Sequence, residues 1–235
     1  MVGGDASYAI NVLTGAPNKK YKHTDIAKDA LFDLVKGASD ADAMISAGRR
    51  VGGSDKNVSK NGLAQSHAYT VLGAFLVNDA NGSPRKLYKI RNPWGSETYK
   101  GPYSDSDSDS TTWDTSLKQA VAFENKNDGT FFMDETTYFT EFVETVISTD
   151  TTDLTHSYFL IQNDKSTTKC DYMYNSDNCA AHTFTVKSVE AQKLYISVNT
   201  WDSRTYPTSC LYNPETKSWD GWGGPNNAWH YYQIR

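Results

Sequence analysis

Cysteine is scarce in this sequence of 235 residues: none occurs before Cys170, and the other two are Cys179 and Cys210. The N-terminal residues 1–5 do not form a secretory signal. An odd number of cysteines in such a chain favours free thiols in the reducing cytoplasm, with a Cys170–Cys179 disulfide as the alternative. The cysteine-free stretch also excludes a thiol nucleophile from the first two thirds of the sequence.

Long apolar runs and an excess of basic residues are also missing. No run approaches the ~20 residues of a membrane-spanning helix, so the sequence predicts no transmembrane segment. Lys and Arg number 23 against 28 Asp and Glu, a net charge of −5 without any basic cluster. This balance argues against a nucleic-acid partner. Hydrophobic residues at 38% and aromatics at 13% are enough for a core, in one large domain or two small ones.

Two β-rich runs enclose a polar turn in the first half of the sequence. Residues 66–73 and 88–95 flank residues 81–84, a pattern typical of an antiparallel hairpin. His67 opens the first run and Asn92 closes the second, so both are predicted at the same end of the ribbon. A histidine oriented by an amide is two thirds of a Cys-His-Asn catalytic site; two unrelated surface residues are the alternative.

The residues of these two runs resemble the His and Asn boxes of the calpain family of cysteine proteases. The two boxes read His67-Ala68-Tyr69-Thr70-Val71 and Ile90-Arg91-Asn92-Pro93-Trp94-Gly95. The similarity continues through residues 99–105, Trp113 and residues 128–133, and covers most of residues 3–142.

The resemblance implies a part of a calpain-like cysteine endopeptidase that acts on protein substrates. In the family, the residue at His67 is the general base, the one at Asn92 orients it, and the one at Trp94 covers their hydrogen bond. The chemistry implied in this way requires no cofactor.

The family's nucleophile is missing from this sequence. Calpains carry it upstream in a Gln-Gly-…-Gly-Asp-Cys-Trp segment that also supplies the oxyanion-hole Gln, and no such segment is present. Cys170, Cys179 and Cys210 match no family nucleophile, and the resemblance gives Gln65 no oxyanion role. We therefore expect an N-terminal protease subdomain that carries Cys as the partner of this chain. The alternative is a natural chain that has lost catalysis.

Acidic residues after the hairpin raise the question of calcium. Asp105, Asp107 and Asp109 alternate, but an EF-hand loop starting there lacks its Gly at the sixth position and its Glu at the twelfth. By the resemblance, Asp105 and Asp128 fall on two acidic positions of a calcium site in the calpain core. Thr98 and Thr130 stand where animal enzymes commonly carry glutamates, and lost carboxylates weaken such a site. Asp105 and Asp128 are thus candidate calcium ligands of a depleted site.

The predicted fold class is α+β, in two domains. Residues 1–148 resemble the second half of a calpain-like (papain-like) protease core, with an antiparallel sheet and a few helices. Residues 149–235 follow a polar linker and are rich in short strands, which predicts a small all-β domain. This second domain resembles the calpain-type β-sandwich (C2-like) domain, in a truncated or shortened form.

Several local predictions accompany this fold. Residues 25–35 read as a helix with Thr24 as N-cap and Gly37 as its end, followed by a short helix or turn over residues 40–47. Asp128-Gly129 reads as a hairpin turn between residues 121–123 and 131–133. His23 shows no partner in the sequence. The predicted core residues are Val71, Leu72, Phe75, Leu87, Ile90, Phe131 and Phe132.

Two functions from other classes compete with the protease. One is a non-catalytic calpain-like binding or regulatory module, which an upstream coding sequence without a Gln-…-Cys-Trp segment would favour. The other is a transglutaminase-like acyl transferase, but such enzymes pair His with Asp more often, and Asn92-Pro93-Trp94 argues against it.

Overall fold

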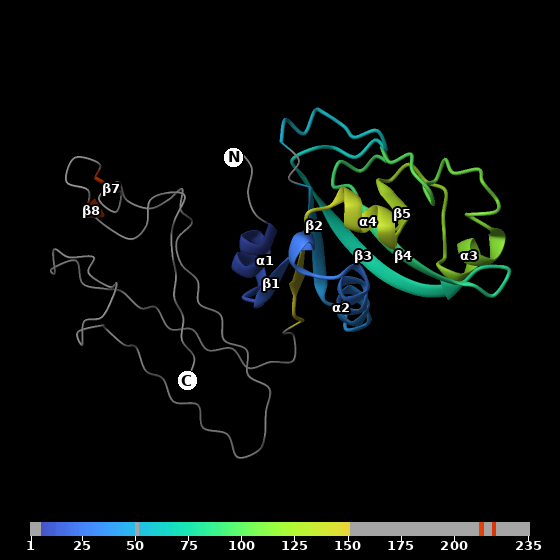
Figure 1. Ribbon diagram of the computed structural model, residues 1–235, viewed down its shortest axis with the longest axis horizontal. Helices are drawn as coiled ribbons and strands as arrows, with labels where there is room; N and C mark the ends of the chain where they lie inside the picture. The colour runs from blue at the N-terminus through green and yellow to red at the C-terminus, as the bar shows by residue number, and fades with distance from the viewer. Residues whose placement is uncertain (1–5, 50–51, 151–211, 214–217, 220–235) are drawn as a thin grey trace, which may run out of the picture. The chain divides into compact units, whose positions relative to one another are not determined.

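The computed structural model describes residues 6–49, 52–150, 212–213 and 218–219 (Figure 1). The chain divides into two units, residues 1–154 and 155–235, and each is considered by itself. Within the described ranges no helix is long and apolar enough to cross a membrane.

The first unit combines helices with one six-stranded antiparallel sheet. Its helices are α1 (Ala6–Thr14), η1 (His23–Asp25, 3₁₀), α2 (Lys28–Asp40), α3 (Thr115–Ala120) and α4 (Glu135–Glu141). Its strands are β1 (Asn18–Lys22), β2 (Met44–Arg49), β3 (His67–Asn78), β4 (Pro84–Arg91), β5 (Thr130–Asp134) and β6 (Glu144–Ser148). They lie in the order β1-β6-β2-β3-β4-β5. The predicted α+β class with an antiparallel sheet is confirmed for this unit, and the sheet starts before residue 66 because β1 and β2 belong to it.

The hairpin predicted around residues 81–84 is formed by β3 and β4, the two long curved strands of Figure 1. Asn78 pairs with Pro84 at the turn, and Thr70 pairs with Arg91 at the other end. A bulge between Val71 and Gly73 shifts the register. Leu72 is 49% exposed, so its placement in the core was wrong. It directly follows the buried Val71, and successive side chains of a strand point to opposite faces of the sheet.

Two clusters of buried side chains hold the sheet. The larger packs α2 and α4 against it and includes Leu31, Phe32, Tyr88, Ile90 and Tyr138. The smaller surrounds Trp113 and includes Leu87, Leu117 and Phe132. The other predicted core residues are buried, except that Phe75 is partly buried against the second cluster. Both clusters include residues of β4, which fixes the strand that leads to Asn92.

The first long helix starts later than predicted. It runs from Lys28 to Asp40, so that Gly37 lies inside it and residues 44–49 form β2 instead of a helix or turn. The hydroxyl of Thr24 donates to Asp25 Oδ1 within η1 and does not cap α2, which begins after Ala27 without a side-chain cap.

The strand predicted to pair with residues 131–133 across Asp128-Gly129 was also wrong. Residues 121–123 do not form a strand: α3 ends at Ala120, and Phe123 N–H donates to the carbonyl of Lys118 in the turn that follows. β5 pairs with β4 instead, where Ile90 lies opposite Phe131.

Among the described strands, β1 lies at one edge of the sheet and pairs with β6 alone. Three of its five residues are lysines: Lys19, Lys20 and Lys22. Lys20 lies 3.7 Å from a carboxylate oxygen of Glu144, and the ammonium of Lys19 lies 5.0 Å from the ring centre of Tyr21.

The described residues of the second unit form one short antiparallel pair, β7 (Tyr212–Asn213) with β8 (Ser218–Trp219). The predicted sandwich and the three cysteines lie outside the described residues, and the domain boundary at residue 148 stays a prediction.

Candidate active site

The structure brings His67 and Asn92 together. His67 begins β3, and Asn92 directly follows β4 in the same hairpin. His67 Nε2 lies 3.0 Å from Asn92 Oδ1. Asn92 is fully buried and its backbone N–H donates to the carbonyl of Gly129, which ties this end of the hairpin to the β5 side of the sheet. The spatial meeting that the spacing predicted is therefore present.

The hydrogen bonds of Asn92 determine the tautomer of His67. The backbone N–H of Trp94 donates to Asn92 Oδ1 at 3.1 Å, which identifies this atom as the amide oxygen. An amide oxygen only accepts, so Nε2 of a neutral His67 must carry the proton. Nδ1 then keeps its lone pair and can accept a proton from another group. This is the arrangement of a base oriented by an amide.

Two aromatic rings hold the imidazole of His67. The Trp94 ring centre lies 4.6 Å away at a tilt of 42°, although Trp94 itself is 46% exposed. The Tyr69 ring meets the imidazole edge-on, with centres 4.9 Å apart. Trp94 thus lies between the imidazole and water on one side, while Tyr69 supports it from the core.

The amide nitrogen of Asn92 is less well satisfied. Its Nδ2 is buried and has no hydrogen-bond partner among the described residues. Buried polar atoms without partners cost free energy and are uncommon in folded proteins. The fold therefore places Asn92 for its oxygen, which holds both His67 and Trp94, and not for its nitrogen.

A hollow of about 220 Å³ adjoins His67. Its lining includes Ser46, Gly48, Ser66, His67, Ala68 and Glu144. A Cβ atom on Gly48 would come within 2.6 Å of Glu144 Cγ, so glycine leaves the space in which this side chain lies. Arg49 and Val146 also line it, and a hollow of this size next to His67 has room for one amino-acid side chain.

The backbone just before His67 is strained. Ser66 has φ of 46°, in the left-handed region that residues with a Cβ adopt only at a cost. Strained residues concentrate at functional sites, where the surrounding structure holds them. No sequence pattern marks this conformation, because serine occupies a position suited to glycine.

Glu97, three residues after Trp94, is an acidic group that sequence reasoning missed. Burial, together with the negative charges of Asp105 and Asp128, raises its pKa to about 7. Burial, followed by the charge of Asp128, also raises the pKa of Asp105. The three carboxyl groups therefore repel one another: Glu97 and Asp105 belong to the connection between β4 and α3, and Asp128 belongs to the connection between α3 and β5. The only sequence signal was that Glu97 lies next to Thr98, in the calcium-associated stretch.

The predicted calcium ligands do not complete a metal site. Asp105 Oδ2 accepts a hydrogen bond from the backbone N–H of Lys126, and Asp128 Oδ1 accepts one from the backbone N–H of Thr130. One oxygen of each carboxylate is therefore already bonded to the backbone. Asp105 Oδ1 is buried without a partner. Even so, the described ranges hold no group of three His, Cys, Asp or Glu residues arranged to bind a metal. Asp105 and Asp128 therefore stay candidate calcium ligands, as the sequence predicted.

His23, which showed no partner in the sequence, is buried in a network of its own. Its Nδ1 lies 3.2 Å from the carbonyl of Phe139, and its Nε2 lies 2.8 Å from the hydroxyl of Thr145. The same hydroxyl is 2.7 Å from that of Tyr138. Burial lowers the pKa of His23, so this residue is a neutral core histidine.

A family model described as calpain family cysteine protease matches residues 1–149. Calpain-14 of Homo sapiens is 40% identical over 96 residues, which are 40% of this chain and 14% of that protein. Calpain-9 of Mus musculus is 28% identical over 133 residues, which are 56% of this chain and 19% of that protein. The calpain-type cysteine protease DEK1 of Zea mays is 31% identical over 140 residues, which are 56% of this chain and 6% of that protein.

The chain thus matches no more than 19% of the length of these relatives. Among solved structures, the crystal structure of SERA5E from Plasmodium falciparum matches 56% of this chain and 45% of that chain, at 17% identity and a TM-score of 0.31. That likeness is too distant to add to the argument.

Proposed function

Because the chain belongs to the calpain family of cysteine proteases, we propose that it supplies the general base and the orienting amide of an endopeptidase that cleaves proteins. The hydrogen bond between His67 Nε2 and Asn92 Oδ1 carries this proposal. It leaves the Nδ1 lone pair of His67 free for a thiol proton.

The proposed reaction begins when His67 Nδ1 takes the proton of a cysteine thiol. The thiolate attacks the carbonyl carbon of the scissile peptide bond, and the imidazolium then gives its proton to the leaving amine. A water attacks the resulting thioester, with His67 again taking a proton, and hydrolysis releases the acid and restores the thiol. Asn92 keeps the ring oriented throughout, and the hollow beside His67 receives a substrate side chain.

The nucleophile comes from a partner in this proposal. The described residues include no cysteine, and Cys170 is the first in the chain. In this proposal a subdomain carrying the Cys and the oxyanion-hole Gln of the family brings its thiol to His67, because residues 1–148 contain no cysteine and no Gln-…-Cys-Trp segment. We propose the cytoplasm as the site of action, which suits the free thiols inferred from the odd cysteine count.

We propose that this chemistry needs no cofactor and that Asp105 and Asp128, which lack a third acidic ligand in the described ranges, do not hold calcium by themselves. Direct calorimetric titration of the chain with CaCl₂ checks this point. Saturable binding that Asp105→Asn abolishes would contradict it.

The test is kcat/KM for peptide hydrolysis in a full-length enzyme that contains the Cys segment. His67→Ala should abolish turnover, since nothing else in the described site takes the thiol proton. Asn92→Ala should cost less, because it removes the orientation and not the base. Trp94→Ala should lower kcat/KM by about 1–3 kcal/mol of transition-state free energy, as water competes for the His67–Asn92 bond. A thermal melt of each variant separates these effects from unfolding, and wild-type rates in His67→Ala would end the proposal.

A second candidate is a non-catalytic binding module, which the lack of any cysteine before Cys170 favours. The coding sequence upstream of Met1 discriminates the two. A Gln-…-Cys-Trp segment there supports the protease, and a substituted Cys supports the module.

A further inference from the structure

The segment that leads into His67 is tied to the rest of the domain at several points. Asn61 Nδ2 donates to Glu141 Oε1 at 2.6 Å. Arg49 Nη1 donates to the carbonyl of Leu63 at 3.2 Å. The backbone N–H of Ala64 donates to the hydroxyl of Tyr69 at 2.8 Å. These contacts fix residues 61–64, immediately before the strained Ser66.

Glu141, the last residue of α4, is the centre of these contacts. Its Oε2 accepts from Arg49 Nη2 at 2.8 Å and its carbonyl accepts from Arg49 Nε at 3.0 Å. Its Oε1 accepts from Asn61, so both carboxylate oxygens are used. The side chains of Arg49 and Glu141 are only 6% and 11% exposed. A buried ion pair whose every polar atom is bonded holds its neighbours in one arrangement.

The same centre also reaches the segment after Trp94. The carbonyl of Asn61 accepts from the N–H of Lys100 at 2.9 Å. Next to it, a Cβ atom on Gly62, which has φ of 83°, would come within 1.8 Å of the Thr98 carbonyl. The two segments that flank the His67–Asn92 pair are therefore in direct backbone contact, and Asn61 joins both to Glu141.

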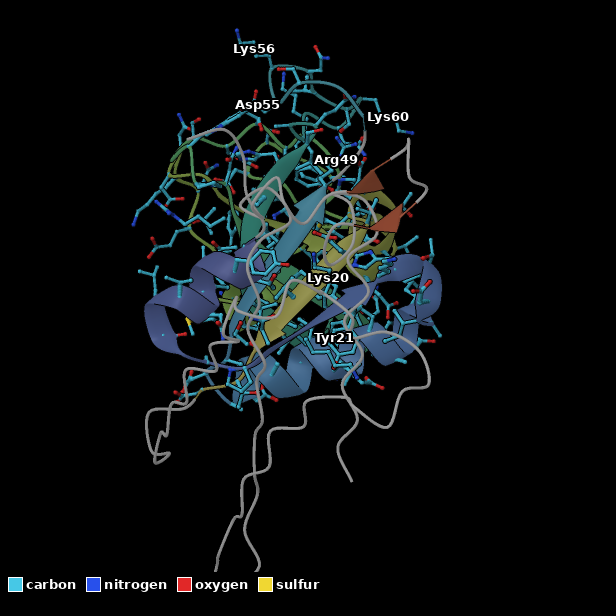
Figure 2. All side chains as sticks on the ribbon, turned by 90° about the vertical axis from the view of Figure 1, so that its left-hand side faces the viewer. Lys20, Tyr21, Arg49, Asp55, Lys56 and Lys60 are labelled. Atoms are coloured by element: carbon cyan, nitrogen blue, oxygen red, sulfur yellow. The ribbon has the colours of Figure 1, made fainter. Side chains whose placement is uncertain are left out.

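The remainder of the loop is different. Residues 52–58 are exposed, and in Figure 2 the side chains of Asp55, Lys56 and Lys60 point outward at the top of the view, with Arg49 below them. The contacts to Glu141 thus hold only the part of the loop next to His67. Arg49 also lies directly opposite His67 in the ladder of β2 and β3.

We propose that Glu141 is a positioning residue for His67. Through Asn61 and Arg49 it holds residues 61–66 in the strained path that sets the imidazole against Asn92. The inference rests on the role proposed above for His67, but it concerns the geometry of the ring and can be tested without turnover.

The test uses the full chain and measures how fast the Nε2–H proton of His67 exchanges with solvent, by ¹⁵N-edited NMR of the imidazole groups. Asn61→Ala cuts one bond and leaves the Arg49–Glu141 pair intact. It should speed this exchange about tenfold or more, since a hydrogen bond to a charged group stabilises the closed arrangement by at least that factor. Glu141→Gln, which removes the negative charge, should also speed the exchange of this proton. It should further leave both neutral tautomers of His67 populated.

The Nδ1–H of His23 is the internal reference, because its network contains neither Asn61 nor Glu141. A positioning role speeds exchange at His67 only, whereas general destabilisation speeds both. Lys60→Ala, an exposed neighbour in the same loop, is the matched control and should change neither rate.

Unchanged exchange at His67 in Asn61→Ala would overturn the proposal, as would equal acceleration at His67 and His23 or an equal effect of Lys60→Ala. Because none of these measurements depends on hydrolysis, an inactive full-length enzyme would refute the proposed function and leave the positioning role to be decided separately.

Discussion

At the scale of single residues, the site contains one backbone conformation that its side chain does not suit. Ser66 has φ of 46° directly before His67. The left-handed region costs a residue with a Cβ about 1–2 kcal/mol, whereas glycine adopts it freely. The chain therefore maintains a local strain next to the proposed base.

Ser66→Gly should raise the free energy of unfolding by about 0.5–1 kcal/mol, after the greater freedom of glycine in the unfolded chain is subtracted. Denaturant unfolding measures the change. Ser116→Gly, in the right-handed backbone of α3, should instead lower the stability and serves as the control. A loss of stability in Ser66→Gly would show that the backbone is not strained there.

Glu97 gives the site a pH dependence. Its pKa is about 7 in the folded chain and near 4.5 when unfolded, so the folded state holds the proton more tightly. Stability is therefore greatest below pH 4.5 as far as Glu97 is concerned, and it declines as the pH rises through 7. Glu97→Gln should raise Tm by a few degrees at pH 8 and leave it nearly unchanged at pH 4.5.

Glu124→Gln is the control for this pair of melts, because Glu124 is exposed and its pKa is lowered by Lys126 instead of raised. An equal shift of Tm at both pH values in Glu97→Gln would contradict the assignment.

At the scale of elements, the side-chain alternation along β3 and β4 decides which apolar residues support the hairpin. Ile90 is fully buried, whereas Leu72 is 49% exposed beside the bulge. Ile90→Ala should lower the free energy of unfolding by about 2–5 kcal/mol through lost burial and a residual cavity. Leu72→Ala should cost less than about 1 kcal/mol. Urea unfolding of both variants checks the comparison, and equal losses would place Leu72 in the core after all.

The same contrast shows how far the sequence could predict these elements. The hairpin and the meeting of His67 with Asn92 followed from local signals, namely alternation, a polar turn and the length of the ribbon. The bulge did not, because Val71-Leu72-Gly73 reads as a regular strand. The start of α2 was missed because η1 takes up residues 23–25, and only packing in three dimensions reveals this.

Contacts between distant elements were harder still to predict. The bonds from Glu141 to Arg49 and Asn61 span 92 and 80 residues, and no local pattern marks them. The predicted strand partner of β5 was wrong for the same reason. Residues 121–123 lie nearby in the sequence, but they follow the end of α3, and β5 pairs with β4. The raised pKa of Glu97 likewise depends on burial and on the charges of Asp105, eight residues along the same connection, and Asp128, from the connection that follows α3.

At the scale of the whole molecule, the proposed function assigns the base to this chain and the nucleophile to a partner. On that proposal the chain alone should not hydrolyse casein, with or without calcium, because the thiolate and the oxyanion donors would come from the partner. The release of soluble peptides from labelled casein is the measurement. Hydrolysis that a thiol-alkylating reagent blocks would mean that Cys170, Cys179 or Cys210 is catalytic.

The lysines of β1 have a consequence for the molecule in concentrated solution. An unpaired strand edge is a template for edge-to-edge self-association, the first step towards fibrillar aggregates. If two copies of β1 paired in parallel and in register, each of Lys19, Lys20 and Lys22 would lie opposite the same lysine of the other copy. If they paired antiparallel about the centre of the strand, Lys20 would lie opposite Lys20 of the other copy. Directly opposed like charges disfavour strand pairing. The sequence of this one short strand thus disfavours extension of the sheet into a neighbouring copy at its β1 edge.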